Sequence, residues 1–432
     1  MNKRKIIIVV IIFAVVLAFL NLQTIRKFMK DNLPSEVKIF AKELFFGKNY
    51  INRIKLLEIS HYNEKFLPKT EFENITLEKK IVDTLLESEE IHYNKVKNTN
   101  IVTRKFFIEN IKDNLLIVGL DGRIKYIDNL NFKESKNIPS NLHDFKILSI
   151  LDVELINDEL FISLSSRENQ DSGCSYFHLV KSKFDYNKLI FDNFFQTEKC
   201  LVNTSGGRIH YFNNNGTEGI ILSTGASDEE RDLAQDDKSP YGKMLFFSLD
   251  GNEYKIFSKG HRNPQGLTIN NGIILSTEHG PYGGDEINKI SFGKNYGFPI
   301  SSYGEDYSFF DEILKSRSNY VFKKSHAKYN FEEPIFTFIP AIGISEIIRV
   351  PDSFSKYWIN NYLITSLNGR SIYRIKFNDK FSKILYSEKI FIGERIRDIK
   401  FNKKFNSFVL ALEGSGSLGI LQSPQSKNIL IK

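Results

Sequence analysis

The chain carries its most informative residues in three segments, KGHRNPQGL (259–267), STEHGPYGGDEIN (276–288) and GKNYGFP (293–299). Within about forty residues, these three segments contain seven glycines, one arginine, two histidines and a pair of adjacent carboxylates. Glycines at this density allow tight turns and close approach of the backbone to a ligand, and polar side chains on such loops are well placed to contact it. The stretch therefore indicates a ligand site built on loops between short strands.

Short β-type runs recur on both sides of this stretch. Six of them are apolar or nearly so, and they start 45, 60, 53, 89 and 46 residues apart: LLIVGL (115–120), LFISLS (160–165), IILST (220–224), IILST (273–277), YLITSL (362–367) and FVLAL (408–412). Most are followed by a second strand-like run, such as 122–126 or 371–375. A multi-strand unit repeated every 45 to 60 residues is typical of a propeller blade. Six such runs predict an all-β, six-bladed β-propeller.

The order and spacing of GHRNPQGL, EHGP, GGDEIN and NYG resemble the signature of one family. It is the family of soluble, pyrroloquinoline-quinone-dependent aldose and glucose dehydrogenases, also called the glucose/sorbosone dehydrogenase family. Weaker resemblance extends from about Gly206 to Asp398. The resemblance implies a six-bladed propeller with quinone, calcium and sugar at the centre of one face.

The expected domain organisation follows from these patterns. We expect an anchor in residues 1–24, a helical juxtamembrane connector in 25–99, a propeller in 100–425 and a tail in 426–432. Within the connector, Pro34 to Phe46 has the pattern of an amphipathic helix. The longest interval between runs contains an insertion at about 300–333, which we expect to form a loop that covers or shapes a pocket.

The N-terminus has the layout of a signal or an anchor. An unbroken apolar run, Ile6 to Leu20, follows Lys3-Arg4-Lys5, and no small-residue cleavage site follows it. An uncleaved signal anchor is favoured over a cleaved signal peptide, and over a buried helix. We therefore expect a bacterial protein anchored in the inner membrane, with the propeller in the periplasm or outside the cell.

The net charge of +7 does not predict a nucleic-acid partner. Six basic residues and no acidic residue lie in the first thirty positions, which leaves 53 basic against 52 acidic residues in the rest. No basic run that would form a nucleic-acid-binding face occurs in the body of the chain.

Two cysteines, Cys174 and Cys200, are separated by a segment that could fold back as a hairpin. In an exported chain they could form a disulfide, and two unpaired buried thiols are the alternative.

The resemblance assigns cofactor and metal roles to particular residues. The carbonyl groups of Gly280 and Pro281 would bind calcium, an ion that prefers oxygen ligands. Arg262 and Asn263 would reach the quinone oxygens, and Arg262 could stabilise negative charge on the reduced cofactor. Further positions that match the family are the paired arginines Arg395 and Arg397 for the quinone carboxylates, Asn368 where some members carry a cofactor-contacting lysine, and the acidic pair Asp285 and Glu286, which would brace loops or bind structural calcium.

The catalytic base is the main departure from the family pattern. Family members use a histidine to take the proton of the sugar hydroxyl while hydride passes to the quinone, and Thr204 stands at that position. A threonine hydroxyl is too weakly basic for this task near neutral pH. His279, which matches a pocket-lining position, is a possible substitute base.

Three functions are consistent with this sequence. The first is a quinone-dependent sugar dehydrogenase that oxidises an aldose at C1, with an altered site. The second is a propeller that binds a carbohydrate without turnover. The third is an interaction protein of the cell envelope that uses the insertion as its contact surface.

Overall fold

The computed structural model describes residues 76–82, 88–96 and 105–427, apart from 133, 168–172, 215, 227, 250, 252 and 307–320. All of them belong to one compact unit, Thr70–Lys432. Within these residues, no helix combines the length and the apolar character needed to cross a membrane. The expected anchor (1–24) and the expected amphipathic helix (34–46) lie outside the described residues, and so does most of the tail.

The described strands form six antiparallel sheets, which we call blades 1 to 6. Blade 1 contains β3 (Phe106–Ile111), β4 (Asn114–Gly119), β5 (Ile124–Ile127) and β6 (Lys136–Ile138). Blade 2 contains β7 (Ile147–Ile156), β8 (Glu159–Ser166), β9 (Tyr176–Lys183) and β10 (Asp192–Gln196). Blade 3 contains β11 (Gly206–Asn214), β12 (Thr217–Thr224), β13 (Lys243–Ser248) and β14 (Tyr254–Lys259).

The remaining blades follow in chain order. Blade 4 contains β15 (Pro264–Asn270), β16 (Ile273–Glu278), β17 (Asp285–Ile290) and β18 (Phe336–Phe338). Blade 5 contains β19 (Ile344–Arg349), β20 (Asn361–Ser366), β21 (Ser371–Phe377) and β22 (Ile384–Phe391). Blade 6 contains β23 (Ile396–Asn402), β24 (Ser407–Leu412) and β25 (Ser417–Gln422), extended by β2 (Ser88–Val96) and β1 (Thr76–Val82). Short 3-10 turns lie between strands: η2 (Asp128–Leu130), η3 (Leu142–Phe145), η4 (Arg231–Ala234) and η5 (His326–Tyr329).

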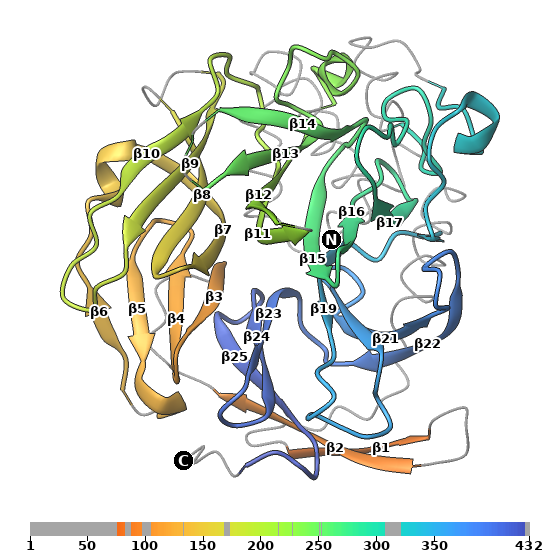
Figure 1. Cartoon of the computed structure of the whole chain (residues 1–432). Helices are drawn as coiled ribbons and strands as arrows, with labels where there is room; N and C mark the ends of the chain where they lie inside the picture. The colour runs from red at the N-terminus through yellow and green to blue at the C-terminus, as the bar shows by residue number, and fades with distance from the viewer. Residues whose placement is uncertain are drawn as a thin grey trace, which may run out of the picture. The chain divides into compact units, whose positions relative to one another are not determined.

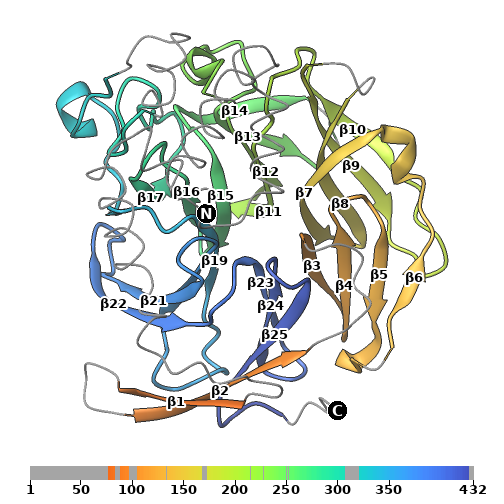
Figure 2. The ribbon, with the colours of Figure 1, turned by 180° about the vertical axis from the view of Figure 1, so that it is seen from behind.

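The blades form a closed ring. The first strands β3, β7, β11, β15, β19 and β23 neighbour one another in this order, and β23 returns to β3 (Figures 1 and 2). These six inner strands therefore surround a central axis. The prediction of an all-β, six-bladed propeller is confirmed.

The six apolar runs occupy equivalent places in this ring. They coincide with β4, β8, β12, β16, β20 and β24, the second strand of each blade. A second strand is covered on both faces by neighbouring blades, so side chains on both faces are buried and the run reads as continuously apolar. Counting these runs therefore gave the correct number of blades.

The prediction of a helical connector in 25–99 is wrong for part of that segment. Residues 76–82 and 88–96 are strands, and β2 pairs antiparallel with β25 from His92↔Gln422 to Val96↔Leu418. Ile91, Tyr93 and Val96 are buried. Chain 396–422 supplies only three strands of blade 6, so the segment before blade 1 completes the sheet.

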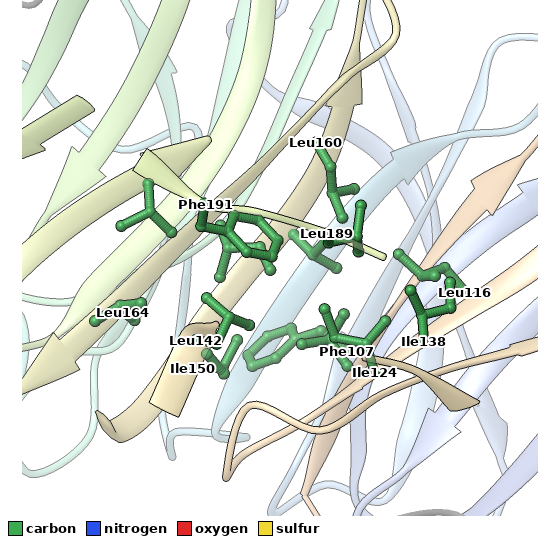
Figure 3. Close-up of a cluster of buried hydrophobic side chains, with 14 of the residues drawn as sticks. Phe107, Leu116, Ile124, Ile138, Leu142, Ile150, Leu160, Leu164, Leu189 and Phe191 are labelled. Carbon is green, nitrogen blue, oxygen red and sulfur yellow. The ribbon is translucent and has the colours of Figure 1, made fainter. Parts of the chain in front are cut away.

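Apolar side chains fill the six spaces between neighbouring blades. One buried cluster lies in each space. In the cluster between blades 1 and 2, Phe107 and Leu116 face Leu160 and Phe191 (Figure 3). Full burial of one such side chain contributes about 1.5–3 kcal/mol. The ring is thus held together by apolar contacts at every interface.

One buried guanidinium also joins the blades at the axis. Arg208 on β11 has a side chain that is only 3% exposed, and its Nη1 lies 2.9 Å from Asp152 Oδ1, 2.8 Å from Glu346 Oε2 and 3.5 Å from Asp398 Oδ1. These carboxylates belong to blades 2, 5 and 6. Three acidic partners compensate the cost of burying this charge.

The same guanidinium reaches the other two inner strands. Its Nε donates to the carbonyl oxygen of Gln265 on β15 at 2.6 Å, and its Nη2 donates to that of Arg397 on β23 at 3.0 Å. Its Cζ lies 5.1 Å from the centre of the Phe107 ring on β3. Arg208 therefore contacts the inner strand of every other blade.

The axis holds more carboxyl groups than cations. Elsewhere on the axis, Lys400 Nζ lies 2.6 Å from Glu109 Oε2 and 2.7 Å from Glu154 Oε2. Burial raises the pKa of Glu346 to about 8 and that of Asp152 to about 6, even though Arg208 counteracts the shift. In the native state these two carboxyl groups therefore remain protonated at pH values where the same groups of the unfolded chain, with pKa values near 4–5, have lost their protons.

This retention predicts how stability depends on pH. An acid whose folded pKa is raised binds more protons in the native state than in the unfolded state, so the free energy of unfolding falls as pH rises from about 5 to 8. Glu346→Gln mimics the protonated acid, and we expect it to flatten this decline in urea unfolding curves measured between pH 5 and 9. Glu332→Gln, at an exposed ion pair with Lys294, is the control and should keep the wild-type slope. An unchanged slope in Glu346→Gln would contradict the prediction.

Candidate functional site

A chain of polar side chains crosses one end of the axis, where the inner strands begin. Asn263, which precedes β15, accepts at Oδ1 from the backbone N–H of Gly206 at 3.1 Å and from Gln265 Nε2 at 2.7 Å. Gln265 Oε1 in turn accepts from Arg397 Nη1 at 2.9 Å. Blades 3, 4 and 6 are therefore joined at this end of the ring.

The chain continues through a carboxylate to the second arginine. Glu413, which follows β24, accepts from Arg397 Nε at 2.7 Å and from Arg395 Nη2 at 3.2 Å. Arg397 lies within the β-bulge between Ile396 and Asp398, Arg395 directly precedes β23, and both reach Glu413. We call Asn263, Gln265, Arg395, Arg397 and Glu413 the axial mouth.

The axial mouth brings together three residues that the resemblance selects, Asn263, Arg395 and Arg397. Two of its members were not selected from the sequence. Gln265 lies inside the GHRNPQGL motif and could have been found there. Glu413 follows the sixth apolar run directly, so its position at the end of a second strand was the available signal.

Arg262 points toward the glycine-rich turn. Its guanidinium is bonded to both carboxylate oxygens of Asp228, with Nη2 2.7 Å from Oδ2 and Nε 3.1 Å from Oδ1. Nη1 donates to the carbonyl oxygens of His279 at 3.2 Å and Gly280 at 2.9 Å. The Gly280 carbonyl, one of the two selected as calcium ligands, thus already faces a cation.

Asp285 stabilises the turn from Gly280 to Gly284 through hydrogen bonds. Its Oδ1 accepts from the Gly280 N–H at 3.2 Å, and its Oδ2 accepts from the N–H groups of Ile342 and Ile344 at 3.0 and 2.9 Å. A Cβ at Gly280 would lie 2.2 Å from the Gly283 oxygen, so a larger residue would force the turn to move. Asp285 braces this turn against blade 5.

Glu286 has different partners. Its Oε2 accepts from Asn288 Nδ2 at 3.2 Å, and its Oε1 lies 3.4 Å from Nε2 of His326 in the insertion. His326 Nδ1 also donates to the Tyr296 carbonyl at 3.0 Å. Glu286 therefore ties the insertion to blade 4, on the side opposite to the contacts of Asp285.

The described ends of the insertion lie against the same turn. Tyr282 and Glu305 exchange backbone hydrogen bonds of 2.7 and 2.9 Å. A small cavity is lined by Gly280 and Pro281 on one side and by Ser301, Ser302 and His326 on the other, with Arg262 also among its lining residues. The insertion thus shapes the space next to the proposed calcium carbonyls.

Thr204 lies in a loop that a disulfide holds. Its Oγ1 is 3.3 Å from Ser175 Oγ, and Ser175 N–H donates to the Leu201 carbonyl at 2.7 Å. Cys174 and Cys200 are bonded to each other, so the disulfide alternative is the one found. Thr204 lies two residues before Gly206, whose backbone N–H donates to Asn263 of the axial mouth.

The hydrogen bonds of His279 define its tautomer. Asn263 accepts two hydrogen bonds at Oδ1, so its Nδ2 is the donor toward His279 Nδ1 at 3.4 Å. Burial lowers the pKa of His279, which keeps the ring neutral. Nε2 then carries the hydrogen, and this atom is buried without a hydrogen-bond partner among the described residues. The role of His279 as a substitute base stays a prediction, and in this tautomer Nε2 is the donor of the ring.

Asn368 is separate from these contacts. It is exposed in the β20–β21 loop next to Gly343, outside the hydrogen-bond chain of the axial mouth.

The paired arginines at this face suit a quinone that carries carboxylates. Arg395 and Arg397 lie side by side on Glu413, the Gly280 oxygen accepts from Arg262, and a buried imidazole nitrogen has no partner among the described residues. Among the described residues, no group of three His, Cys, Asp or Glu side chains could hold a metal ion. A calcium ion here would therefore depend on the backbone oxygens of Gly280 and Pro281, and Asp285 and Glu286 stay predictions as ligands.

Comparison with known proteins identifies relatives of this chain. The chain is 28% identical over 233 residues to the aldose sugar dehydrogenase YliI of Escherichia coli, covering 50% of this chain and 59% of that protein. It is 44% identical over 78 residues to the quinoprotein glucose dehydrogenase B of Acinetobacter calcoaceticus, covering 15% and 16%. The chain spans about half the length of the first curated relatives that it matches.

A solved structure shares the fold. The apo form of the soluble aldose sugar dehydrogenase from Escherichia coli superposes with a TM-score of 0.62 at 22% identity, covering 78% of this chain and 99% of that one. The family model described as Glucose / Sorbosone dehydrogenase matches residues 111–420, which is most of the ring. The chain belongs to the glucose/sorbosone dehydrogenase family.

Proposed function

We propose that the axial mouth binds pyrroloquinoline quinone, and that the chain is a sugar oxidoreductase that oxidises an aldose at C1. The observation that carries this proposal is the continuous chain of side chains from Asn263 through Gln265 and Arg397 to Arg395. It links the residues suited to quinone oxygens with those suited to quinone carboxylates. The name of the Acinetobacter relative, a quinoprotein, supports the choice of cofactor.

Each residue has a role that its chemistry allows. Arg395 and Arg397 bind carboxylates with planar, charged donors. Arg262, fixed by Asp228, holds positive charge near the quinone oxygens, where it stabilises charge that develops in the reaction. The Gly280 and Pro281 carbonyls hold calcium. The quinone, when bound, accepts two electrons from the sugar. His279 donates to a ligand oxygen through Nε2.

Reconstitution tests this proposal. Adding pyrroloquinoline quinone and calcium to the purified full chain should change the cofactor's absorbance and allow dye reduction with aldoses. Removal of calcium with a chelator should lower the affinity for quinone, since the bound cation that would contact the quinone oxygens is lost. An unchanged absorbance spectrum, with no dye reduction by any aldose, would contradict the proposal.

Thr204 supports a second candidate, a propeller that binds sugar without turning it over. The residue at the base position is a hydroxyl that contacts another hydroxyl, Ser175, and the tautomer of His279 leaves it as a donor. If His279 keeps this tautomer, neither group takes the proton of the sugar hydroxyl at neutral pH. Under this candidate, sugar raises the thermal unfolding midpoint without turnover.

Thr204→His separates the two candidates. General-base catalysis contributes about 10²–10⁴-fold, so we expect kcat of the reconstituted chain to rise by at least about a hundredfold with little change in KM. Thr204→Asn, which has no basic group, is the matched control and should show no gain. If both variants stay at the wild-type rate although quinone and sugar bind, the binding candidate is favoured.

We further propose that the ring is exported and anchored by residues 1–24 in the inner membrane. The disulfide between Cys174 and Cys200 supports export, since disulfides persist in oxidising compartments. Protease added to spheroplasts should degrade the ring of the full chain while a cytoplasmic marker survives. Protection of the ring until the membrane is lysed would contradict export.

A further inference from the structure

We propose that Lys105 is a third cation of the axial mouth and binds, together with Arg395 and Arg397, a carboxylate group of the quinone. Lys105 immediately precedes β3 in blade 1, the blade next to blade 6, which carries both arginines. This inference rests on the proposed function, and it assigns a cofactor contact to a blade that the resemblance leaves without one.

The direction of the Lys105 side chain follows from strand alternation. Two residues further on, the Phe107 ring lies against the Arg208 guanidinium at 5.1 Å, and four residues on, Glu109 binds Lys400 at 2.6 Å; both partners belong to the axis. Lys105 is still paired with β4, because its carbonyl accepts from the Leu120 N–H at 3.1 Å. Residues i, i+2 and i+4 of a strand share a face. Lys105 therefore points to the axis, one step above Phe107 and toward the mouth.

The neighbouring strand brings the arginines to the same place. β3 and β23 lie side by side, and the Ile108 N–H donates to Asp398 Oδ2 at 3.0 Å across them. Arg395 and Arg397 lie at the beginning of β23, as Lys105 lies at the beginning of β3. Lys105 interacts electrostatically with both arginines, with Arg208 and with Glu413.

Several charged groups gather at this place. Glu413 is bonded by both guanidinium groups and also attracts Lys105 electrostatically. Burial, reinforced by the surrounding arginines, lowers the pKa of Lys105 to about 8. Half-buried cations that repel one another are stabilised by an anionic ligand.

This arrangement suits a rigid ligand with more than one carboxylate. A guanidinium holds a carboxylate through two parallel hydrogen bonds, whereas an ammonium group acts as a point charge with three rotatable donors. Arg397 is nearly buried and fixed by Gln265 and Glu413, while 42% of the Arg395 side chain is exposed. Lys105 can therefore contact a carboxylate from the side of blade 1, while the arginines bind it from the side of blade 6.

Calorimetric titration with pyrroloquinoline quinone in the presence of calcium tests this role. Because the loss of a hydrogen bond to a charged group weakens binding by about ten- to a hundredfold, we expect Lys105→Met in the full chain to bind with a Kd higher by that factor. Lys105→Arg keeps the charge and should retain most of the affinity. Lys136→Met removes the same charge from β6, the exposed outer strand of the same blade, and should bind like wild type.

The pH dependence provides a second readout that a merely structural role would not change. Wild-type affinity should fall as pH rises above about 8, because Lys105 loses its proton there. Lys105→Met and Lys105→Arg should both lack this fall, since neither side chain titrates in that range.

The outcomes distinguish this inference from the proposed function. If wild type binds no quinone, the proposed function fails and this role of Lys105 fails with it. If wild type binds and Lys105→Met binds equally well with the same pH profile, only the role of Lys105 is overturned. Equal losses in Lys105→Met and Lys136→Met would also overturn it, because the effect would then be one of overall charge.

Discussion

The ring depends on a buried guanidinium at its axis. Apolar clusters hold each pair of neighbouring blades, but such contacts act only locally and do not fix all six blades relative to one another. Arg208 fixes the blades relative to one another, because its side chain contacts the inner strand of every other blade. A guanidinium suits this position, since its five donors project in fixed directions and its charge persists at any relevant pH.

The same interaction supports the ligand site. Arg208 donates to the carbonyl groups of Gln265 and Arg397, and the side chains of these two residues form the middle of the axial mouth. Arg208 thus fixes the backbone that carries these two side chains of the axial mouth. The glycine-rich turn is fixed separately, by Asp285 and by Arg262. Two independent supports therefore position the proposed carboxylate-binding end and the proposed calcium-binding end of the site.

The sequence predicted the ring because its second strands are buried on both faces, which makes six apolar runs visible. It also selected Arg262, Asn263, Arg395 and Arg397 through motifs. β1 and β2 were missed because an outer strand added from the far end of the chain has no local signal beyond weak alternation. Lys105, Asp228 and Glu413 were missed for a related reason, since each is an ordinary charged residue whose partners come from another blade. The tautomer of His279 required the hydrogen bonds of Asn263 and Gln265, which only the folded chain supplies.

Hydrogen–deuterium exchange of the Arg208→Met variant tests most directly whether one residue unites the ring. If the guanidinium ties all the blades at the axis, amide protection should fall together in β3, β7, β11, β15, β19 and β23, while the outer strands β6, β10 and β14 change little. A loss of protection confined to β11 and the adjacent strands of blade 3 would contradict the account, because Arg208 would then stabilise only its own blade.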